Sequence, residues 1–117
     1  MTTSEGFARR LRLASPNDVR RVMSRGRRHR TTHLEIAWLV NDAGHPRLGL
    51  IVPKFQSNAV ARNRLRRQLK EIWRRGGLPH LGPIDIVVRT RPATYTARPS
   101  DLKAEVLGWV QSKTPGS

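Results

Sequence analysis

Residues 58–75 read NAVARNRLRRQLKEIWRR and carry the strongest helical pattern of the chain. Apolar side chains recur there at intervals of three and four residues, which gathers them into one stripe along an α-helix. The stripe consists of Ala61, Leu65, Leu69 and Ile72, with Trp73 at its margin. Most of the other positions carry basic side chains. The pattern predicts an amphipathic helix with one buried side and a cationic surface elsewhere.

The charge on this helix is unusual because seven lysines and arginines accompany a single glutamate, Glu71. The basic side chains follow two rows, one of Arg62, Arg66, Lys70 and Arg74 and one of Arg64, Arg67 and Arg75. Like charges four residues apart destabilise an isolated helix by roughly a few tenths of a kcal/mol per pair. Phosphate groups compensate such charge, and arginine suits them because its planar fork donates to two phosphate oxygens. We therefore interpret the helix as a phosphate-binding surface rather than as a solvated face.

The composition of the whole chain indicates the same kind of partner. Its 117 residues include 23 Lys+Arg and 8 Asp+Glu, which gives a formal net charge of +15. A charge this large on a small body indicates a polyanionic partner, with nucleic acid first and an anionic membrane surface second. Nine basic residues lie between Arg9 and Arg30 and eight between Lys54 and Arg75, which predicts two positive surfaces on one scaffold.

The same composition excludes several classes of protein. Because the chain has no cysteine, disulfide frameworks, cysteine-ligated zinc and thiol nucleophiles are ruled out. Its longest apolar runs, such as residues 36–40, are far shorter than the roughly 20 residues of a membrane span. No apolar segment of the kind found in a secretory signal is visible at the N-terminus. We expect one cytoplasmic domain over residues 1–117, with its core at about residues 7–113 and flexible ends at residues 1–6 and 114–117.

A second helix is predicted near the N-terminus from its capping residues. Ser15 is suited to the N-cap, Pro16 to the first helical position and Asp18 to completing a capping box. The helix is expected to end near Arg25, because Gly26 is a natural C-terminal stop.

Three segments have the pattern of strands. Residues 33–40 alternate in hydrophobicity, and residues 47–52 and 84–88 are short runs rich in β-branched and aliphatic side chains. Residues 41–46 are typical of a turn, so we expect the first two strands to pair as a hairpin.

A last helix completes the expected architecture. Ser100 and Asp101 are suited to capping it. Its apolar face consists of Leu102, Val106, Trp109 and Val110. The order helix, strand, strand, helix, strand, helix predicts an α/β two-layer sandwich, in which helices cover a small mixed sheet.

No group of residues has the spacing of a catalytic or metal site. The four histidines are isolated from one another, at His29, His33, His45 and His80. The eight acidic residues are spread singly, with Asp18 suited to capping and Glu71 to pairing with neighbouring arginines. The chain has no phosphate-binding loop, dinucleotide fingerprint or nucleophile elbow. We expect no enzyme active site in the chain itself.

The motif Arg62-Asn63-Arg64 lies at the centre of residues 58–71, and Lys54 precedes this stretch. Together these residues resemble the signature of the bacterial ribonuclease P protein component. The resemblance extends over most of the chain, through Arg10-Leu11, the spacing of Asp18, Val22 and Gly26, Leu48-Gly49, Asp85-Ile86-Val87-Val88 and Arg91-Pro92. It implies a single α/β sandwich with an unusual left-handed β-α-β crossover.

The resemblance also implies an accessory function. The catalyst would be a large RNA, and the protein would help it bind precursor tRNA and remove the 5′ leader. The lone chain would then be a subunit of the endoribonuclease ribonuclease P without catalytic residues of its own. It would act as a monomer, with one protein per RNA. The protein motif would hold no cofactor, and Mg²⁺ would serve the reaction catalysed by the RNA.

By position, the resemblance assigns two binding surfaces. The residues that would contact the catalytic RNA are Lys54, Asn58, Arg62, Asn63, Arg64, Arg66, Arg67 and Lys70. A cleft between the first helix and the sheet would hold the single-stranded leader, and its residues are Val19, Arg20, Met23, Arg27, Arg28, Ala37, Arg89 and Arg91.

The sequence departs from the family pattern at a few of these positions. Val19, Met23 and Ala37 stand where aromatic residues are usual. Because stacking on an aromatic ring is worth roughly 1–3 kcal/mol per base, we expect leader binding to depend more on the cleft's arginines. Phe55 and Ser57 replace the usual lysine and glycine and alter the turn into the motif helix. Trp38, by contrast, is expected on the opposite side of the sheet, in the core.

Three other functions are less consistent with these residues. A structural RNA-binding protein such as a ribosome component would also be basic, but the Arg62-Asn63-Arg64 motif argues against it. A DNA-binding helix would need a positioning helix before a short turn, whereas residues 54–57 join the motif helix to a strand. A protein-only nuclease would require clustered carboxylates to hold metal ions.

Overall fold

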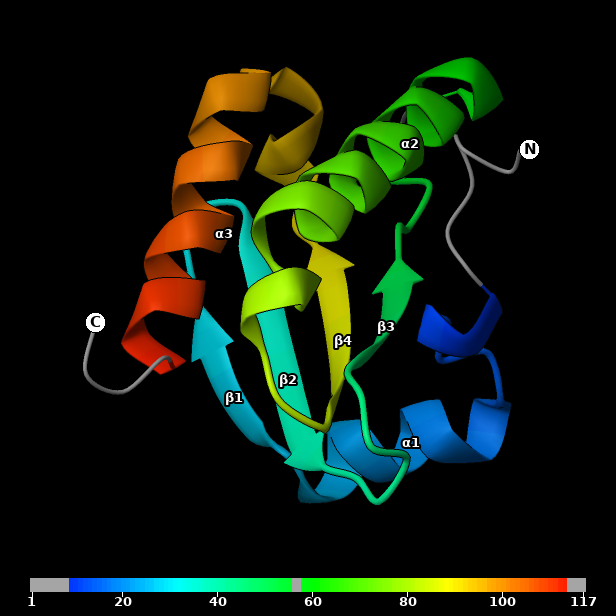
Figure 1. Cartoon of the computed structure of the whole chain (residues 1–117). Helices are drawn as coiled ribbons and strands as arrows, with labels where there is room; N and C mark the ends of the chain where they lie inside the picture. The colour runs from blue at the N-terminus through cyan, green and yellow to red at the C-terminus, as the bar shows by residue number, and fades with distance from the viewer. Residues whose placement is uncertain (1–8, 56–57, 114–117) are drawn as a thin grey trace.

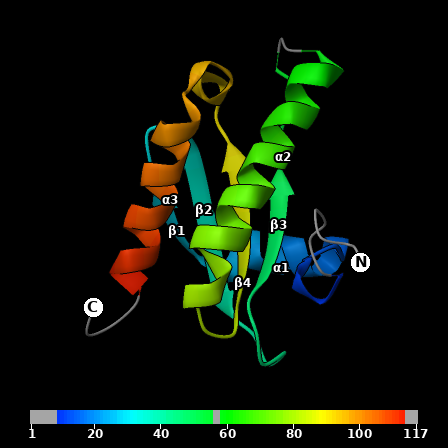
Figure 2. The ribbon, with the colours of Figure 1, turned by 45° about the horizontal axis from the view of Figure 1, so that its top comes forward.

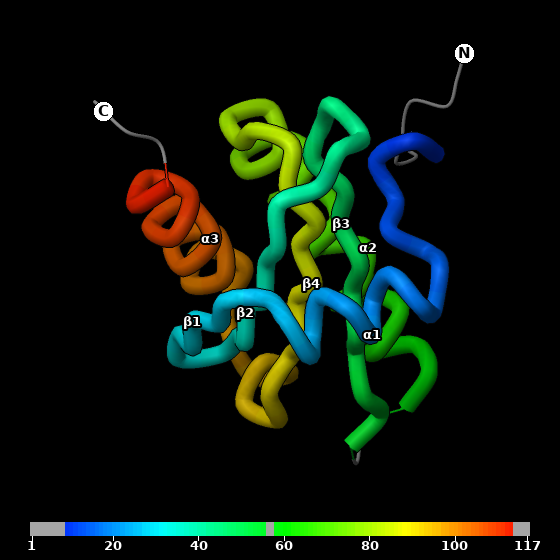
Figure 3. Tube along the Cα trace, turned by 90° about the horizontal axis from the view of Figure 1, so that it is seen from below, coloured from blue at the N-terminus to red at the C-terminus, as the bar shows by residue number. Residues whose placement is uncertain are grey.

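The computed structural model describes residues 9–55 and 58–113, which form one four-stranded sheet covered by helices on both faces (Figure 1). The elements in chain order are η1 (Arg9–Leu11), α1 (Pro16–Arg25), β1 (Arg27–Arg30), β2 (Leu34–Val40), β3 (Arg47–Ile51), α2 (Ala59–Gly76), η2 (Leu78–His80), β4 (Ile84–Thr90), η3 (Pro92–Thr96) and α3 (Pro99–Lys113), where η marks a 3-10 helix. Seen from below, α1 runs across the strands of the sheet (Figure 3). Helices α2 and α3 pack on the other face, so the predicted class of helices packed on a small mixed sheet is confirmed.

Helix α1 begins and ends where its capping residues predict. The Ser15 side-chain oxygen accepts a hydrogen bond from the Asp18 backbone N–H at 3.4 Å, and Pro16 is the first helical residue. The N–H of Gly26 closes the last turn onto the Val22 carbonyl at 2.8 Å. A Cβ atom at Gly26 would lie 2.6 Å from the Trp38 carbonyl oxygen, so the chain can pass this close to β2 only with glycine.

The order of strands in the sheet is β1-β2-β4-β3, and the predicted hairpin between β2 and β3 is wrong. Strand β4 lies between them, antiparallel to β2 and parallel to β3. The true hairpin partner of β2 is β1, which the sequence did not reveal because its four residues are all exposed and show no alternation. Strand β4 suits the central position because its nearly continuous apolar run can be buried on both faces of the sheet.

The connection from β3 through α2 to β4 has the left-handed sense that the resemblance implies. Figure 1 shows β3 and β4 running parallel, with α2 in front of the sheet and β4 to the left of β3. A right-handed crossover, the sense found in roughly 98% of such units, would place β4 on the other side of β3. The left-handed connection places the basic helix α2 over the centre of the sheet.

The larger core lies between the sheet and helices α2 and α3. Its fully buried members include Leu69 and Trp73 of α2 and Val106 of α3. Trp38 contributes from β2 as predicted, with its ring edge-on to Trp109 at 5.3 Å between centroids. The predicted buried face of α3 is confirmed, since Leu102, Val106, Trp109 and Val110 are all buried.

The start of α3 differs slightly from the prediction. The helix begins at Pro99, so Ser100 lies within the first turn rather than at its cap. Asp101 does contribute to this end, because its carboxylate accepts a hydrogen bond from the Arg98 N–H at 3.4 Å.

A carboxylate on α3 joins this helix to the start of β2. Glu105 accepts hydrogen bonds from the Thr31 hydroxyl, the His33 ring and the His33 backbone N–H, the last at 2.9 Å. Burial raises the pKa of Glu105, but the hydrogen bonds from Thr31 and His33 outweigh burial and hold that pKa below its ordinary value.

A buried carboxylate also joins α1 to three strands. Asp85 of β4 is fully buried, and its two oxygens accept hydrogen bonds from Nε and Nη2 of Arg47, each at 2.8 Å. The Asn41 amide, just after β2, donates to the same carboxylate at 2.8 Å. Arg21 of α1 lies 3.6 Å from it. One side chain thus holds the end of the sheet and the helix packed beneath it.

Replacing Asp85 by alanine is expected to destabilise the fold by about 3–5 kcal/mol, because Arg47 and Asn41 lose their buried partner. Urea denaturation measures the difference in the free energy of unfolding. The matched control is Asp42→Ala, which removes an exposed carboxylate and should change stability by less than about 0.5 kcal/mol. Equal stability of the two variants would contradict a structural role for Asp85.

Candidate nucleic-acid interface

Helix α2 presents the cationic surface that its sequence predicts. Asn58 is the N-cap, and its side-chain oxygen accepts a hydrogen bond from the Ala61 N–H at 2.8 Å. The apolar stripe points into the core, where Leu65, Leu69 and Trp73 are buried. This packing fixes the rotation of the helix, so the basic rows are directed away from the core.

The residues assigned to RNA binding on this surface differ in their exposure and in their interactions with the rest of the protein. Asn63, Arg64 and Arg67 are exposed and have no hydrogen-bond or ion-pair partner within residues 9–55 and 58–113. Lys54, at the end of the segment that follows β3, is exposed but does interact with another group of the protein. In contrast, Arg62 is half-buried, and its Nε donates to the Val52 carbonyl at 2.8 Å.

Three positive charges crowd together where the N-terminal segment passes α2. Arg12 pairs with Leu48 in a parallel bridge, which places it beside β3. Burial lowers the pKa of Lys70, and the positive charges of Arg12 and Arg66 lower it further. Glu71 does not relieve this charge, because it pairs with arginines in the next turn of α2. An anion bound here would relieve the repulsion.

Arg12 is a site residue that the sequence analysis did not select. Arg12 is one of the nine basic residues between Arg9 and Arg30. However, no local sequence pattern indicates that this part of the chain runs along β3 toward α2. The Leu13 N–H donates to the Leu48 carbonyl at 2.9 Å and fixes that course.

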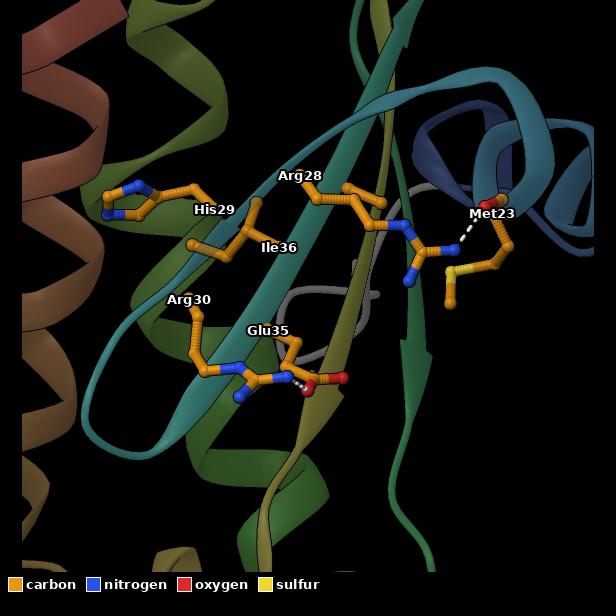
Figure 4. A pocket seen from close by; sticks show the side chains of 7 residues that line it. Met23, Arg28, His29, Arg30, Glu35 and Ile36 are labelled. Carbon is orange, nitrogen blue, oxygen red and sulfur yellow. Dashed lines mark hydrogen bonds and ion pairs between the residues drawn. The ribbon is translucent and has the colours of Figure 1, made fainter.

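The second surface is a cleft on the opposite face of the sheet, with a cavity of about 200 Å³. It is lined by Met23, Arg28, His29, Arg30, Glu35, Ile36 and Ala37 (Figure 4). The Arg28 guanidinium points to α1 and donates to the Met23 carbonyl, while Arg30 Nη2 lies 2.9 Å from the Glu35 carboxylate (Figure 4). The cleft therefore combines an apolar floor with arginines at its rim.

The structure brings together several of the residues assigned to this cleft. Met23, Arg28 and Ala37 line the cavity, and Val19 packs into the small apolar cluster beneath α1. Arg89 is exposed and pairs in register with Glu35, which places it on the same face of the sheet.

Three assigned arginines lie elsewhere. Arg27 pairs with Trp38 in register, so it faces the side of the sheet that carries α3. Arg20 is exposed on α1 and donates to the Asn17 side chain at 3.1 Å. Arg91 donates from Nη1 to two backbone carbonyls, those of Thr31 and Thr32, each at 3.1 Å, and so holds the turn before β2.

Two charged residues of the cleft, Arg30 and Glu35, were not selected from the sequence. Both follow from the register of β1 with β2, in which Arg28 lies opposite Ala37 and Arg30 opposite Glu35. Because β1 itself was not predicted, the alternation that directs Arg28 and Arg30 to one face could not be used.

The turn into α2 has an unusual backbone at one of the two departures from the family pattern. Phe55 has φ 50°, the left-handed region that a bulky residue seldom adopts. Its ring meets Tyr95 edge-on, with 6.2 Å between centroids. Ser57, the other departure, lies outside the described residues.

The side chains gathered on these two surfaces are suited to binding phosphates and bases. Within residues 9–55 and 58–113, no three histidines or acidic residues lie close enough to hold a metal ion. In the same part of the chain, no helix has the length and apolar character needed to cross a membrane.

Comparison with known proteins decides the family. The model of the Ribonuclease P family matches residues 7–113, nearly the whole chain. The chain belongs to the ribonuclease P protein family. This match confirms the family that the sequence motif indicated.

Ribonuclease P proteins of several bacteria are similar over most of their length. The ribonuclease P protein component of Syntrophobacter fumaroxidans is 38% identical over 108 residues, covering 92% of this chain and 91% of the relative. That of Thioalkalivibrio sulfidiphilus is 31% identical over 117 residues, covering 98% and 97%.

Solved structures of ribonuclease P proteins share the fold. The protein from Staphylococcus aureus superposes with a TM-score of 0.77 at 24% identity, covering 87% of this chain and 93% of that one. The protein from Thermotoga maritima gives a TM-score of 0.77 at 23% identity, covering 86% and 96%. At these identities the likeness establishes the fold of the chain.

Replacing Arg12 by alanine is expected to raise the pKa of Lys70 toward its ordinary value, because one nearby positive charge is removed. An NMR titration of the lysine side-chain resonances measures this change. Arg20→Ala, which removes an arginine from α1, is the control and should leave the Lys70 pKa unchanged. If Arg12→Ala has no effect either, Arg12 does not belong to the cationic surface of α2.

Proposed function

We propose that this chain binds the catalytic RNA of ribonuclease P through α2 and helps that RNA remove the 5′ leader from precursor tRNA. The observation that carries the proposal is the Arg62-Asn63-Arg64 motif on a helix whose Arg64 and Arg67 have no protein partner in the described residues. Unpaired arginines on a rigid helix are ready to bind phosphates bidentately. Membership of the ribonuclease P protein family supplies the identity of the RNA.

The cleft beside α1 is proposed to hold the single-stranded leader. Its apolar floor of Met23 and Ala37 offers a surface for a base. Arg28 and Arg30 each use Nη2 on a protein oxygen, which leaves their other N–H groups for the sugar-phosphate backbone. Among the described residues, no phenylalanine, tyrosine or tryptophan lines the cavity, so contact with bases would be weaker than stacking on such a ring and charge would contribute more.

The remaining features of the proposal concern the holoenzyme. Catalysis would be carried out by the RNA with Mg²⁺, and the protein would act as a monomer, one per RNA, in the cytoplasm. Adding the purified protein to its host's catalytic RNA at low Mg²⁺ should stimulate cleavage of precursor tRNA, whereas protein alone should cleave nothing. Absence of stimulation would sink the proposal and favour a structural RNA-binding role such as that of a ribosome component.

Replacing Arg64 and Arg67 together by alanine is expected to weaken binding to the catalytic RNA. The slope of log affinity against log salt should fall by roughly 0.7–0.9 for each phosphate that α2 no longer binds. Filter binding over a range of salt concentrations measures both quantities. Lys103→Ala, at an exposed position of α3, is the control for the removal of a surface charge. An unchanged slope and affinity in the double variant would remove α2 from the interface.

Replacing Met23 by phenylalanine is expected to tighten binding of precursor tRNA to the assembled holoenzyme, because a ring is added where a leader base could stack. One stacking interaction is worth roughly 1–3 kcal/mol. Mature tRNA, which lacks the leader, is the control ligand and should bind as before. Equal effects on both tRNAs would show that Met23 does not line the leader site.

A further inference from the structure

Helices α2 and α3 lie side by side on one face of the sheet (Figure 2). A second groove lies on this face, lined by residues of α2 and of η3. Its volume is about 210 Å³, and it is lined by Ala61, Arg64, Leu65, Gln68, Thr94, Tyr95 and Ala97. This is smaller than the roughly 300–1,000 Å³ of pockets for drug-sized ligands. The groove is therefore of a size for one planar ring system rather than for a folded partner or a nucleic-acid duplex.

One aromatic ring lines this groove, and a second ring packs against it. Tyr95 lines it and is held in place because its hydroxyl donates to the Pro53 carbonyl at 2.7 Å. Phe55 meets Tyr95 edge-on, with an angle of 85° between the ring planes, and is 41% exposed. The left-handed backbone at Phe55 is unfavourable for a bulky side chain, and such strain tends to persist at functional sites. An exposed ring held in this way is suited to stacking.

The polar side chains of the groove complement a nucleotide. Arg64 and Gln68 lie one turn apart on the same side of α2, and neither has a partner within the described residues. The Gln68 amide supplies one acceptor and two donors, which match the edge of a base. The Arg64 guanidinium can bind the adjoining phosphate or stack on the base.

The charge of the groove favours RNA over other partners. None of the described residues that line it carries a carboxylate, and Glu71, the one acidic residue of α2, is paired with Arg74 and Arg75. RNA that is read by its base edges is single-stranded, because unpaired bases can leave the stack and meet aromatic side chains. The groove shares α2 with the Arg62-Asn63-Arg64 motif, whereas the leader cleft lies across the sheet.

We propose that this groove, together with the exposed ring of Phe55 that packs against its Tyr95 wall, binds one unpaired base of the catalytic RNA. The base stacks on the Phe55 ring, which Tyr95 supports edge-on, while Gln68 pairs with the edge of the base and Arg64 holds its phosphate. This inference rests on the proposed function and adds a base-binding subsite to a surface otherwise explained by phosphate binding alone.

The test compares substitutions at Phe55 in binding to the catalytic RNA. Phe55→Ala is expected to weaken binding roughly 5- to 150-fold, the effect of removing one base stack. The salt dependence should stay unchanged, because every bound phosphate keeps its cation. Phe55→Tyr keeps a ring and should bind like the wild type. Val60→Ala, at another exposed apolar residue near the start of α2, is the matched control and should have no effect.

A second readout separates stacking from a change in folding. The Phe55→Trp variant places an indole beside Tyr95, and its added fluorescence should be quenched by the catalytic RNA but not by heparin, a polyanion without bases. Gln68→Ala should weaken RNA binding without reducing the salt slope. Full affinity in Phe55→Ala, or equal quenching by RNA and heparin, would overturn the subsite.

The assay also identifies the source of the RNA. If Phe55→Ala binds the catalytic RNA normally but weakens binding of precursor tRNA to the assembled holoenzyme, the base belongs to the substrate and the assignment to the catalytic RNA is overturned. If the wild-type chain itself neither binds the catalytic RNA nor stimulates cleavage, the proposed function fails. Normal binding and stimulation by the wild type, with no effect at Phe55, would remove only the subsite.

Discussion

The carboxylate of Asp85 is the group on which the arrangement of both binding surfaces depends. It accepts hydrogen bonds from Arg47 and Asn41 and lies beside Arg21, so β4, β3, the end of β2 and α1 meet at one buried charge. A buried carboxylate is costly to leave unpaired, and its partners are therefore held in one geometry. The position of α1 sets the cleft that Met23 and Arg28 line, and the position of β3 sets the start of the crossover that carries α2.

The sheet separates the two surfaces that are proposed to bind RNA. On one face, α2 presents a row of basic side chains, of which Arg64 and Arg67 have no partner among residues 9–55 and 58–113. On the other face, the cleft offers an apolar floor with arginines at the rim. The arginines are also divided by task, because Arg47, Arg62 and Arg91 use donors on protein oxygens and so build the scaffold. A net charge of +15 thus overstates how many cations are available to a partner.

Local patterns predicted the helices well and the pairing of strands poorly. The stripe of α2 repeats over many turns, so its burial could be predicted from residues 58–75 alone. The alternation of residues 33–40 identified a strand but not its neighbour, because pairing with β4 depends on a crossover that no local pattern encodes. The four residues of β1 have no apolar member, so the cleft residue Arg30 was missed. Arg12 was not predicted to lie near α2, and Arg91 was assigned to the cleft although it holds the turn before β2. In both cases the interactions join distant parts of the chain, which no local pattern reveals.

The place of β4 in the sheet also has a consequence for how the chain folds. The strand between β2 and β3 is the last of the four to be synthesised, so the sheet cannot close on the ribosome until Thr90 has emerged. Until then only the β1–β2 hairpin and the isolated helices can form, and the edges of β2 and β3 stay unpaired. Pairing between distant segments and a parallel crossover slow folding. The newly made chain therefore passes through a stage in which its basic segments lack the sheet that later holds them in place.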